Sequence, residues 1–226
     1  MTMPFYVAPE QVMKDKADYA RKGIARGRSL VGLVYAEGIL LAAENPSRTL
    51  HKISEIYDRI AFAGVGKFNE FDQLRVAGVR HADTKGYAYS REDVDARSLA
   101  NVYAQFLGQV FTHEMKPMEV EILVAEVGPK GSGEDQLYHV LYDGTVFDET
   151  RYSVLGGEAE AIQERLESSY VEGASLGEAL KAAVAALAGP ERELSPAELE
   201  VGVLARPSER RAFRRIEVDE LAGLLA

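Results

Sequence analysis

The chain has no cysteine and only four histidines among its 226 residues, and these shortages remove several kinds of chemistry. Without cysteine there is no disulfide, thiolate zinc site, iron–sulfur cluster or thiol nucleophile, which suits a reducing compartment. His51, His81, His113 and His139 never form the His-Glu-x-x-His spacing that places two metal ligands on one helical face. We therefore interpret them as structural side chains and expect neither a metal nor a cofactor.

A basic excess and a long apolar run are also missing. Twenty-six Lys and Arg residues against 36 Asp and Glu residues give a formal net charge of −10, which repels a phosphate backbone. No window approaches the roughly 20 apolar residues of a membrane-spanning helix, and residues 1–8 show neither a basic leader nor a sustained apolar run. We expect a cytoplasmic protein with no nucleic-acid or membrane partner.

What is present is an ordinary globular composition. With 46% apolar residues, 20 glycines and 8 prolines, the chain can bury a large core in one domain, or in at most two small ones. Apolar patterning predicts strands over residues 29–35, 39–43, 50–54, 60–65, 120–127, 137–142, 146–147, 199–204 and 212–216. Helical spacing predicts helices over residues 9–20, 68–79, 99–111, 158–170, 176–187 and 218–225.

The grouping of these elements indicates the fold class. Strands and helices cluster by type along the chain, which is typical of an α+β fold. The first two expected strands contain few polar residues, so both faces of their sheet should be buried. Ser175 and Glu178 have the spacing of a capping box, and Asp143-Gly144 predicts a hairpin turn.

Gly64-Val-Gly-Lys67 invites comparison with a phosphate-binding loop, because glycines let backbone amides approach an anion and lysine adds charge. The match fails at three positions. A Walker motif would need glycine at Ala61 and Ser or Thr at Phe68, and a Rossmann motif would need its third glycine at Asn69. We interpret the segment as a tight turn between a strand and a helix.

Other polar patterns are equally open to a structural interpretation. There is no Gly-x-Ser-x-Gly elbow of a hydrolase. Two basic clusters, formed by Arg21, Lys22, Arg26 and Arg28 and by Arg210, Arg211, Arg214 and Arg215, are typical of solvated or ion-paired surface in an acidic protein. Lys52 lies within an apolar run, and from the pattern alone it belongs on the polar face of a strand.

Several uncommon strings then occur in a fixed order. They are Ala8-Pro-Glu-Gln11, Tyr19-Ala-Arg-Lys-Gly23, Glu44-Asn-Pro-Ser-Arg48, His51-Lys-Ile53, Tyr57-Asp-Arg59, Gly66-Lys-Phe-Asn-Glu-Phe71, Thr84-Lys-Gly-Tyr-Ala-Tyr89 and Leu99-Ala-Asn-Val-Tyr103. Together they resemble the α-type subunit of the 20S proteasome in its actinobacterial form, over about residues 4–225. Any one string alone would be weak evidence, whereas their combined order is specific.

The resemblance implies a four-layer αββα sandwich of the N-terminal-nucleophile (Ntn) hydrolase type with an N-terminal helix extension. Residues 1–8 would be a gate segment and residues 9–226 a single α domain. Seven copies would form the outer ring of a barrel whose inner β-type subunits carry out proteolysis. Unfolded proteins tagged by a small ubiquitin-like modifier would enter, after a ring-shaped ATPase or another cap docks through its C-terminal tail.

The resemblance also implies three sets of site residues. The gate would comprise Thr2, Met3, Pro4, Phe5, Tyr6, Val7, Ala8, Pro9 and Tyr19. The pocket that binds the C-terminal carboxylate of a cap would comprise Lys52, Asp18, Gly66 and Lys67. The loop lining a channel constriction below the gate would comprise Thr112, His113, Glu114, Met115 and Lys116.

The sequence itself bears on whether such a chain is catalytic. An Ntn nucleophile needs a free N-terminal Thr, Ser or Cys directly ahead of the first strand, because its own amine acts as the base. Here Ser29 holds that place behind an expected helix with no evident cleavage site, and Thr2 lies far upstream. We expect a non-catalytic subunit. The alternatives are a self-processing Ntn hydrolase that uses Ser29 and an ordinary α+β protein that forms no ring.

Overall fold

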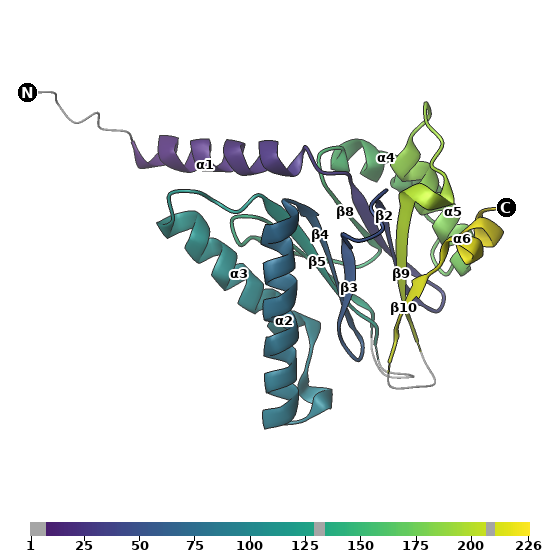
Figure 1. The fold of residues 1–226 in the computed structure, drawn as a ribbon, viewed down its shortest axis with the longest axis horizontal. Helices are drawn as coiled ribbons and strands as arrows, with labels where there is room; N and C mark the ends of the chain where they lie inside the picture. Colours follow the sequence, from purple (N-terminus) through teal and green to yellow (C-terminus); the bar gives the residue numbers. More distant parts are fainter. Residues whose placement is uncertain (1–7, 129–133, 207–210) are drawn as a thin grey trace, which may run out of the picture.

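A computed structural model of the chain describes residues 8–128, 134–206 and 211–226. Two five-stranded sheets lie face to face, and helices cover the outer face of each (Figure 1). Every strand pairing within the sheets is antiparallel. The architecture is a four-layer α+β sandwich, which confirms the predicted fold class.

The first sheet has the strand order β10-β9-β2-β1-β8. Its strands are β1 (Leu30–Tyr35), β2 (Gly38–Glu44), β8 (Tyr152–Leu155), β9 (Leu199–Ala205) and β10 (Phe213–Ile216). Its outer face is covered by α4 (Ala159–Ser169), α5 (Leu176–Ala188) and α6 (Val218–Leu225), and the short helix η2 (Pro196–Glu198) leads into β9. Ser175 and Glu178 exchange hydrogen bonds at the start of α5, which confirms the capping box.

The second sheet has the order β3-β4-β5-β6-β7. Its strands are β3 (Ile53–Tyr57), β4 (Ile60–Gly66), β5 (Val120–Glu126), β6 (Gln136–Val140) and β7 (Val146–Glu149). Its outer face is covered by α2 (Phe68–Ala88) and α3 (Ala96–His113), joined through the short helix η1 (Arg91–Asp93). The turn between β6 and β7 contains Gly144 with a φ of 88°, as a tight hairpin turn requires.

The core between the sheets is wholly apolar in its centre. Leu30, Leu41, Ile53 and Leu123 are fully buried there. The strands β1 and β2 are buried along almost their whole length, so both of their faces are covered. This confirms the expectation that the first strands lie in a sandwiched sheet. No helix in the described ranges is long and apolar enough to cross a membrane.

The helix α1 (Pro9–Ile24) precedes both sheets in the sequence and runs across one end of the sandwich (Figure 1). It begins with proline and carries Glu10 in its first turn, where both residue types are favoured. At its other end Ala20 and Ile24 are buried among the residues of the inter-sheet core. The expected N-terminal helix extension is therefore part of the packed molecule.

Two helices extend beyond the predicted ends. The helix α1 continues through Gly23, where a side chain would collide with the Glu119 carboxylate, so this glycine permits a close approach and does not stop the helix. The helix α2 reaches Ala88 instead of residue 79. Beyond residue 79 its inward face is made by small residues, Ala82 and Gly86, the latter against the Tyr57 hydroxyl, and apolar periodicity underestimates such a face.

The strands differ from the prediction in two places. The strand expected over residues 50–54 is β3, three residues further on, because side chains of the preceding segment bind its backbone in a turn. Asn45 accepts from the Ser47 amide at 3.1 Å, and Ser47 accepts from the Leu50 amide at 3.1 Å. The strand β8 was not predicted. It is four residues long and lies between polar segments, so it has too little alternation to detect.

Candidate functional site

The residues of the expected gate fall mostly outside the part of the chain that the structure describes. That holds for Thr2, Met3, Pro4, Phe5, Tyr6 and Val7. Ala8 is the N-cap of α1, and its carbonyl accepts from the amide of Gln11 at 2.9 Å, while Pro9 is the first helical residue. Tyr19 lies two-thirds of the way along α1 with 48% of its surface exposed.

The expected constriction residues lie beside α1. Thr112 and His113 end helix α3, Glu114 caps it, and Met115 is 97% exposed. The Lys16 ammonium on α1 donates to the carbonyls of Phe111 at 2.9 Å and Thr112 at 3.5 Å. The Lys116 ammonium lies 5.7 Å from the centre of the Tyr19 ring, within cation–π range. The structure thus brings Tyr19 together with the 112–116 segment.

A cluster of charged side chains joins the end of the 112–116 segment to the start of α2. The Lys116 ammonium lies 2.7 Å from the Glu70 carboxylate and 3.0 Å from that of Glu119. Glu70 also accepts from the Glu119 amide at 2.7 Å, and Lys67 lies 3.5 Å away. Burial alone would raise the pKa of Glu70, but the bonds from Lys116 and the Glu119 amide outweigh it and hold the pKa below its usual value. Glu70 is therefore ionised at neutral pH.

Lys52 lies immediately before β3 and is half-buried. Its ammonium donates to the carbonyl of Arg28 at 2.6 Å, and its own carbonyl accepts from the Gly64 amide at 3.0 Å. Burial lowers the pKa of Lys52 to about 8, an effect that Arg28 strengthens and the Glu200 carboxylate opposes. Lys52 is therefore positively charged at neutral pH and loses its charge as the pH rises through about 8.

Gly66 also lies against the segment that joins α1 to β1, and Lys67 follows it in the chain. A side chain on Gly27 would come within 3.1 Å of the Gly66 amide nitrogen, so the two backbones are in close contact. Gly66 has a φ of 101° and approaches the Glu119 carbonyl so closely that only glycine fits. Lys67 follows as the N-cap of α2, as the turn interpretation of this motif predicts. Residues 27–28 thus contact both the Lys52 side chain and this turn.

Asp18 is not part of this cluster. It lies on α1, where its carboxylate is 3.4 Å from the Arg21 guanidinium. In the described ranges of this single chain, no hydrogen bond or ion pair joins Asp18 to Lys52, Gly66 or Lys67. The structure therefore groups three of the four residues expected in the cap-binding pocket.

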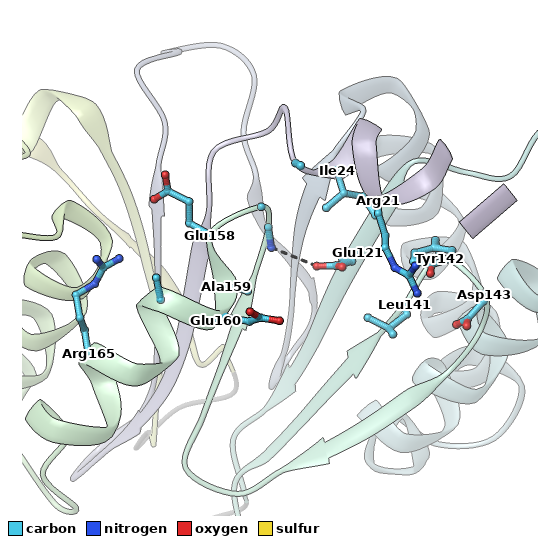
Figure 2. Close-up of a pocket in the computed structure, with 14 residues that line it drawn as sticks. Arg21, Ile24, Glu121, Leu141, Tyr142, Asp143, Glu158, Ala159, Glu160 and Arg165 are labelled. Atoms are coloured by element: carbon cyan, nitrogen blue, oxygen red, sulfur yellow. Dashed lines mark hydrogen bonds between the residues drawn. The ribbon is translucent and has the colours of Figure 1, made fainter. Parts of the chain in front are cut away.

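A cavity of about 830 Å³ opens at the foot of α1, between the two sheets and the start of α4. Figure 2 shows Arg21 pointing from α1 toward Tyr142, and Glu160 pointing toward the same space from α4. The Arg21 guanidinium lies 5.8 Å from the centre of the Tyr142 ring, and Glu121 accepts from the Gly156 amide at 3.2 Å. The lining contains more acidic than basic side chains, so this cavity does not suit an anionic chain terminus.

Sequence reasoning did not single out two buried carboxylates that lie beside the segment ending at Lys52. Glu44 and Glu200 are both buried, on neighbouring strands β2 and β9. Glu44 forms ion pairs with Arg28 and Arg192. The sequence signal for them was a glutamate within each of two otherwise apolar strands, because a glutamate is rarely buried without a charged or hydrogen-bonding partner.

The second basic cluster is paired with acidic side chains, as expected for an acidic protein. Arg211 pairs with Glu55, Arg214 with Glu220 and Arg215 with Glu200. Arg210 lies outside the described residues. Within the described ranges no group of three or more His, Cys, Asp or Glu side chains is arranged to hold a metal ion.

Comparison with known proteins identifies the family. A family model described as "Proteasome subunit" matches residues 24–204. The protein named "Proteasome subunit alpha" of Acidimicrobium ferrooxidans is 66% identical and is aligned over 100% of this chain and 97% of its own. The proteins of the same name from Streptosporangium roseum and Kineococcus radiotolerans are 60% and 58% identical, over 100% of this chain and 88% and 99% of theirs. The four-layer sandwich, the helix ahead of its first strand and these alignments agree, and the chain belongs to the proteasome subunit family as an α-type member.

Proposed function

We propose that this chain forms the gated outer ring of a 20S proteasome core particle and is itself non-catalytic. Seven copies make the ring and control entry to the chamber in which β-type threonine proteases act. The observation that carries the proposal is the position of α1. This helix precedes β1 and places Ala20 and Ile24 in the inter-sheet core, where a self-processing enzyme needs a free N-terminus instead.

The surroundings of Ser29 support a non-catalytic role. Ser29 directly precedes β1, is buried, and its carbonyl accepts from the Glu44 amide at 3.3 Å. Cleavage before Ser29 would detach α1 and uncover the part of the core that Ala20 and Ile24 now fill. Self-processing would therefore destabilise the packed molecule, because that apolar surface would meet water.

The intact mass of the purified chain, combined with its activity, tests this proposal. We expect a mass that includes residues 2–28 and no hydrolysis of fluorogenic peptides by this chain alone, with hydrolysis appearing once a β-type subunit is added. A chain that begins at Ser29 and cleaves peptides without a partner would contradict it. Ser29→Ala is the matched variant, because it would abolish the activity of a self-processing enzyme.

The gate and the cap-binding pocket form the second part of the proposal. Residues 2–8 lead into α1, and Tyr19 on that helix contacts the proposed constriction segment through Lys116. Lys52 has three N–H donors and uses one on Arg28, so others remain for the C-terminal carboxylate of a cap. Asp18, which has no contact with Lys52 within the described part of one chain, would join the pocket from an adjacent copy.

The expected partners follow from these roles. They are further copies of this chain, β-type subunits, a ring-shaped ATPase or another cap, and unfolded proteins tagged by a small ubiquitin-like modifier. The net charge of −10 argues against nucleic acid, and we propose a cytoplasmic location.

A further inference from the structure

The loop that ends at Lys52 is built around one buried carboxylate. Glu200 lies on β9 opposite Ala43 of β2 and is only 7% exposed. One carboxylate oxygen accepts from the Lys52 amide at 2.8 Å and from the Asn45 side-chain amide at 2.7 Å. The other accepts from the Ile53 amide at 3.2 Å and forms an ion pair with Arg215.

Residues 45–52 are therefore held by hydrogen bonds to the Glu200 carboxylate and not by pairing as a strand of either sheet. The Asn45 side-chain amide that binds Glu200 also donates to the Leu50 carbonyl at 2.8 Å, which closes the loop on itself. Arg215 donates to the Ile53 carbonyl at 2.8 Å, so both the amide and the carbonyl of Ile53 are held by this network. A buried carboxylate with this many donors is fully satisfied and fixes the backbone around it.

Glu200 also sets the charges that Lys52 experiences. The charged groups around the Lys52 ammonium are Glu200 on β9, Arg28 ahead of β1, and beyond them Arg215, His51, Glu44 and Arg192. Burial and Arg28 disfavour the protonated amine, while Glu200 favours it. His51, whose ring nitrogen lies 3.3 Å from Glu200, is half-exposed and competes for the same carboxylate.

We propose that Glu200 is a positioning residue of the carboxylate-docking site: it fixes the backbone of Lys52 and keeps the Lys52 ammonium charged. A docking carboxylate then meets a cation that is already in place, so less ordering is required at the moment of binding. The link to docking rests on the proposed function, whereas the effect of Glu200 on Lys52 is measurable in the chain without any cap.

The experiment is acetylation of Lys52 by acetic anhydride in the full chain, followed by mass spectrometry as a function of pH. Only the neutral amine reacts, so the rate has its midpoint at the pKa, which we expect near 8 in the unchanged chain. Glu200→Gln removes the negative charge and is expected to lower the midpoint by about one pH unit. Glu200→Asp keeps the charge and is expected to restore most of that shift.

A matched control separates this effect from general destabilisation. Glu126 is equally buried, on β5 of the other sheet, where it pairs with Arg59 and accepts from the Ala96 amide at 2.7 Å. Glu126→Gln should therefore leave the Lys52 midpoint unchanged. The proposal is overturned if Glu200→Gln leaves the midpoint where it was, or if the Gln and Asp variants shift it equally.

Amide hydrogen exchange in the unchanged chain tests whether Glu200 holds the Lys52 backbone, even if the Glu200→Gln variant does not fold. Among the described residues the His51 amide has no hydrogen-bond acceptor, whereas the Lys52 amide donates to Glu200. We expect the Lys52 amide to exchange with deuterium at least about tenfold more slowly than the His51 amide. Equal exchange would overturn the positioning role. Loss of cap docking would be a separate result, because neither measurement involves a cap.

Discussion

Under the proposed function, Lys52 is the residue whose charge sets how docking responds to pH. Burial lowers its pKa to about 8, so its charge disappears as the pH rises through 8. Capture of a carboxylate requires the protonated form. The stability of the fold changes with pH in the opposite direction. The unfolded chain keeps this proton up to the ordinary pKa of 10.5, so the folded state gains relative stability as the pH rises from 8 to 10.5.

We predict that a peptide with a free C-terminal carboxylate binds the assembled ring more weakly above pH 8. Each further pH unit lowers the affinity by up to about tenfold, because the fraction of protonated Lys52 falls by that factor. Fluorescence polarisation between pH 6.5 and 9.5 measures the effect, with the C-terminally amidated peptide as the control. Equal affinity at the two ends of this range would contradict the assignment of Lys52.

Replacement of the lysine is the direct test at the same position. Lys52→Ala removes the ammonium proposed to meet the carboxylate, so the ratio of cap-stimulated to unstimulated peptide hydrolysis should fall to that seen without a cap. Lys181 on α5 is exposed, and Lys181→Ala provides the control, for which the ratio should stay unchanged. Stimulation of the Lys52→Ala complex at the unchanged level would refute the pocket.

Individual site residues are also the features that the sequence alone predicted least well. Lys52, Gly66 and Lys67 were assigned to a pocket only because strings around them resemble a family, and the structure brings these three near residues 27–28. Glu200 was not named, because its partner Lys52 is 148 residues away and no spacing rule connects them. Contacts of this kind become visible only when strands from opposite ends of the chain pair.

At the scale of elements, the proposed non-catalytic role rests on α1. Ile24 is 2% exposed and fills the inter-sheet core at the end of that helix. We predict that Ile24→Ala lowers the free energy of unfolding by about 2–5 kcal/mol, because a cavity remains where the side chain was. Urea unfolding measures this, with exposed Lys14→Ala as the control. Unchanged stability would mean that α1 does not pack as described.

Elements with one continuous apolar stripe were predicted well, and those built from small residues were not. The helices α3 and α5 were found because their leucines, valines and alanines recur at helical spacing. The last nine residues of α2 were missed because small residues, Ala82 and Gly86, form their inward face and polar residues cover much of the rest. Gly86 packs against the Tyr57 hydroxyl, a contact that local apolar periodicity does not reveal.

At the scale of the whole molecule, clustering of elements predicted only an α+β class. The two facing sheets came from the family resemblance and are seen in the structure, whereas the position of α1 across their end is known from the structure alone (Figure 1). The cavity at the foot of α1 was not foreseen, since it lies between segments from four separate parts of the chain. Its lining from α1, β5, the β6–β7 turn and α4 depends on the assembled layers.

The proposed gate gives a prediction for the assembled particle. Removal of residues 2–8 should raise the rate at which a complex of this chain with a β-type subunit hydrolyses short peptides, because the entry channel is no longer closed. As a control, alanine substitution of exposed Val171, at the far end of α4, should leave the rate unchanged. An equal rate with and without residues 2–8 would show that this segment does not limit entry.

The central claim is that this chain builds the outer ring of a proteolytic barrel and does not act alone. Electron microscopy of the chain co-expressed with a β-type subunit tests it most directly. We predict four stacked rings with sevenfold symmetry, in which this chain occupies the two outer rings and retains α1. Particles without this chain in the outer rings, or a chain that remains monomeric beside its partner, would contradict the account.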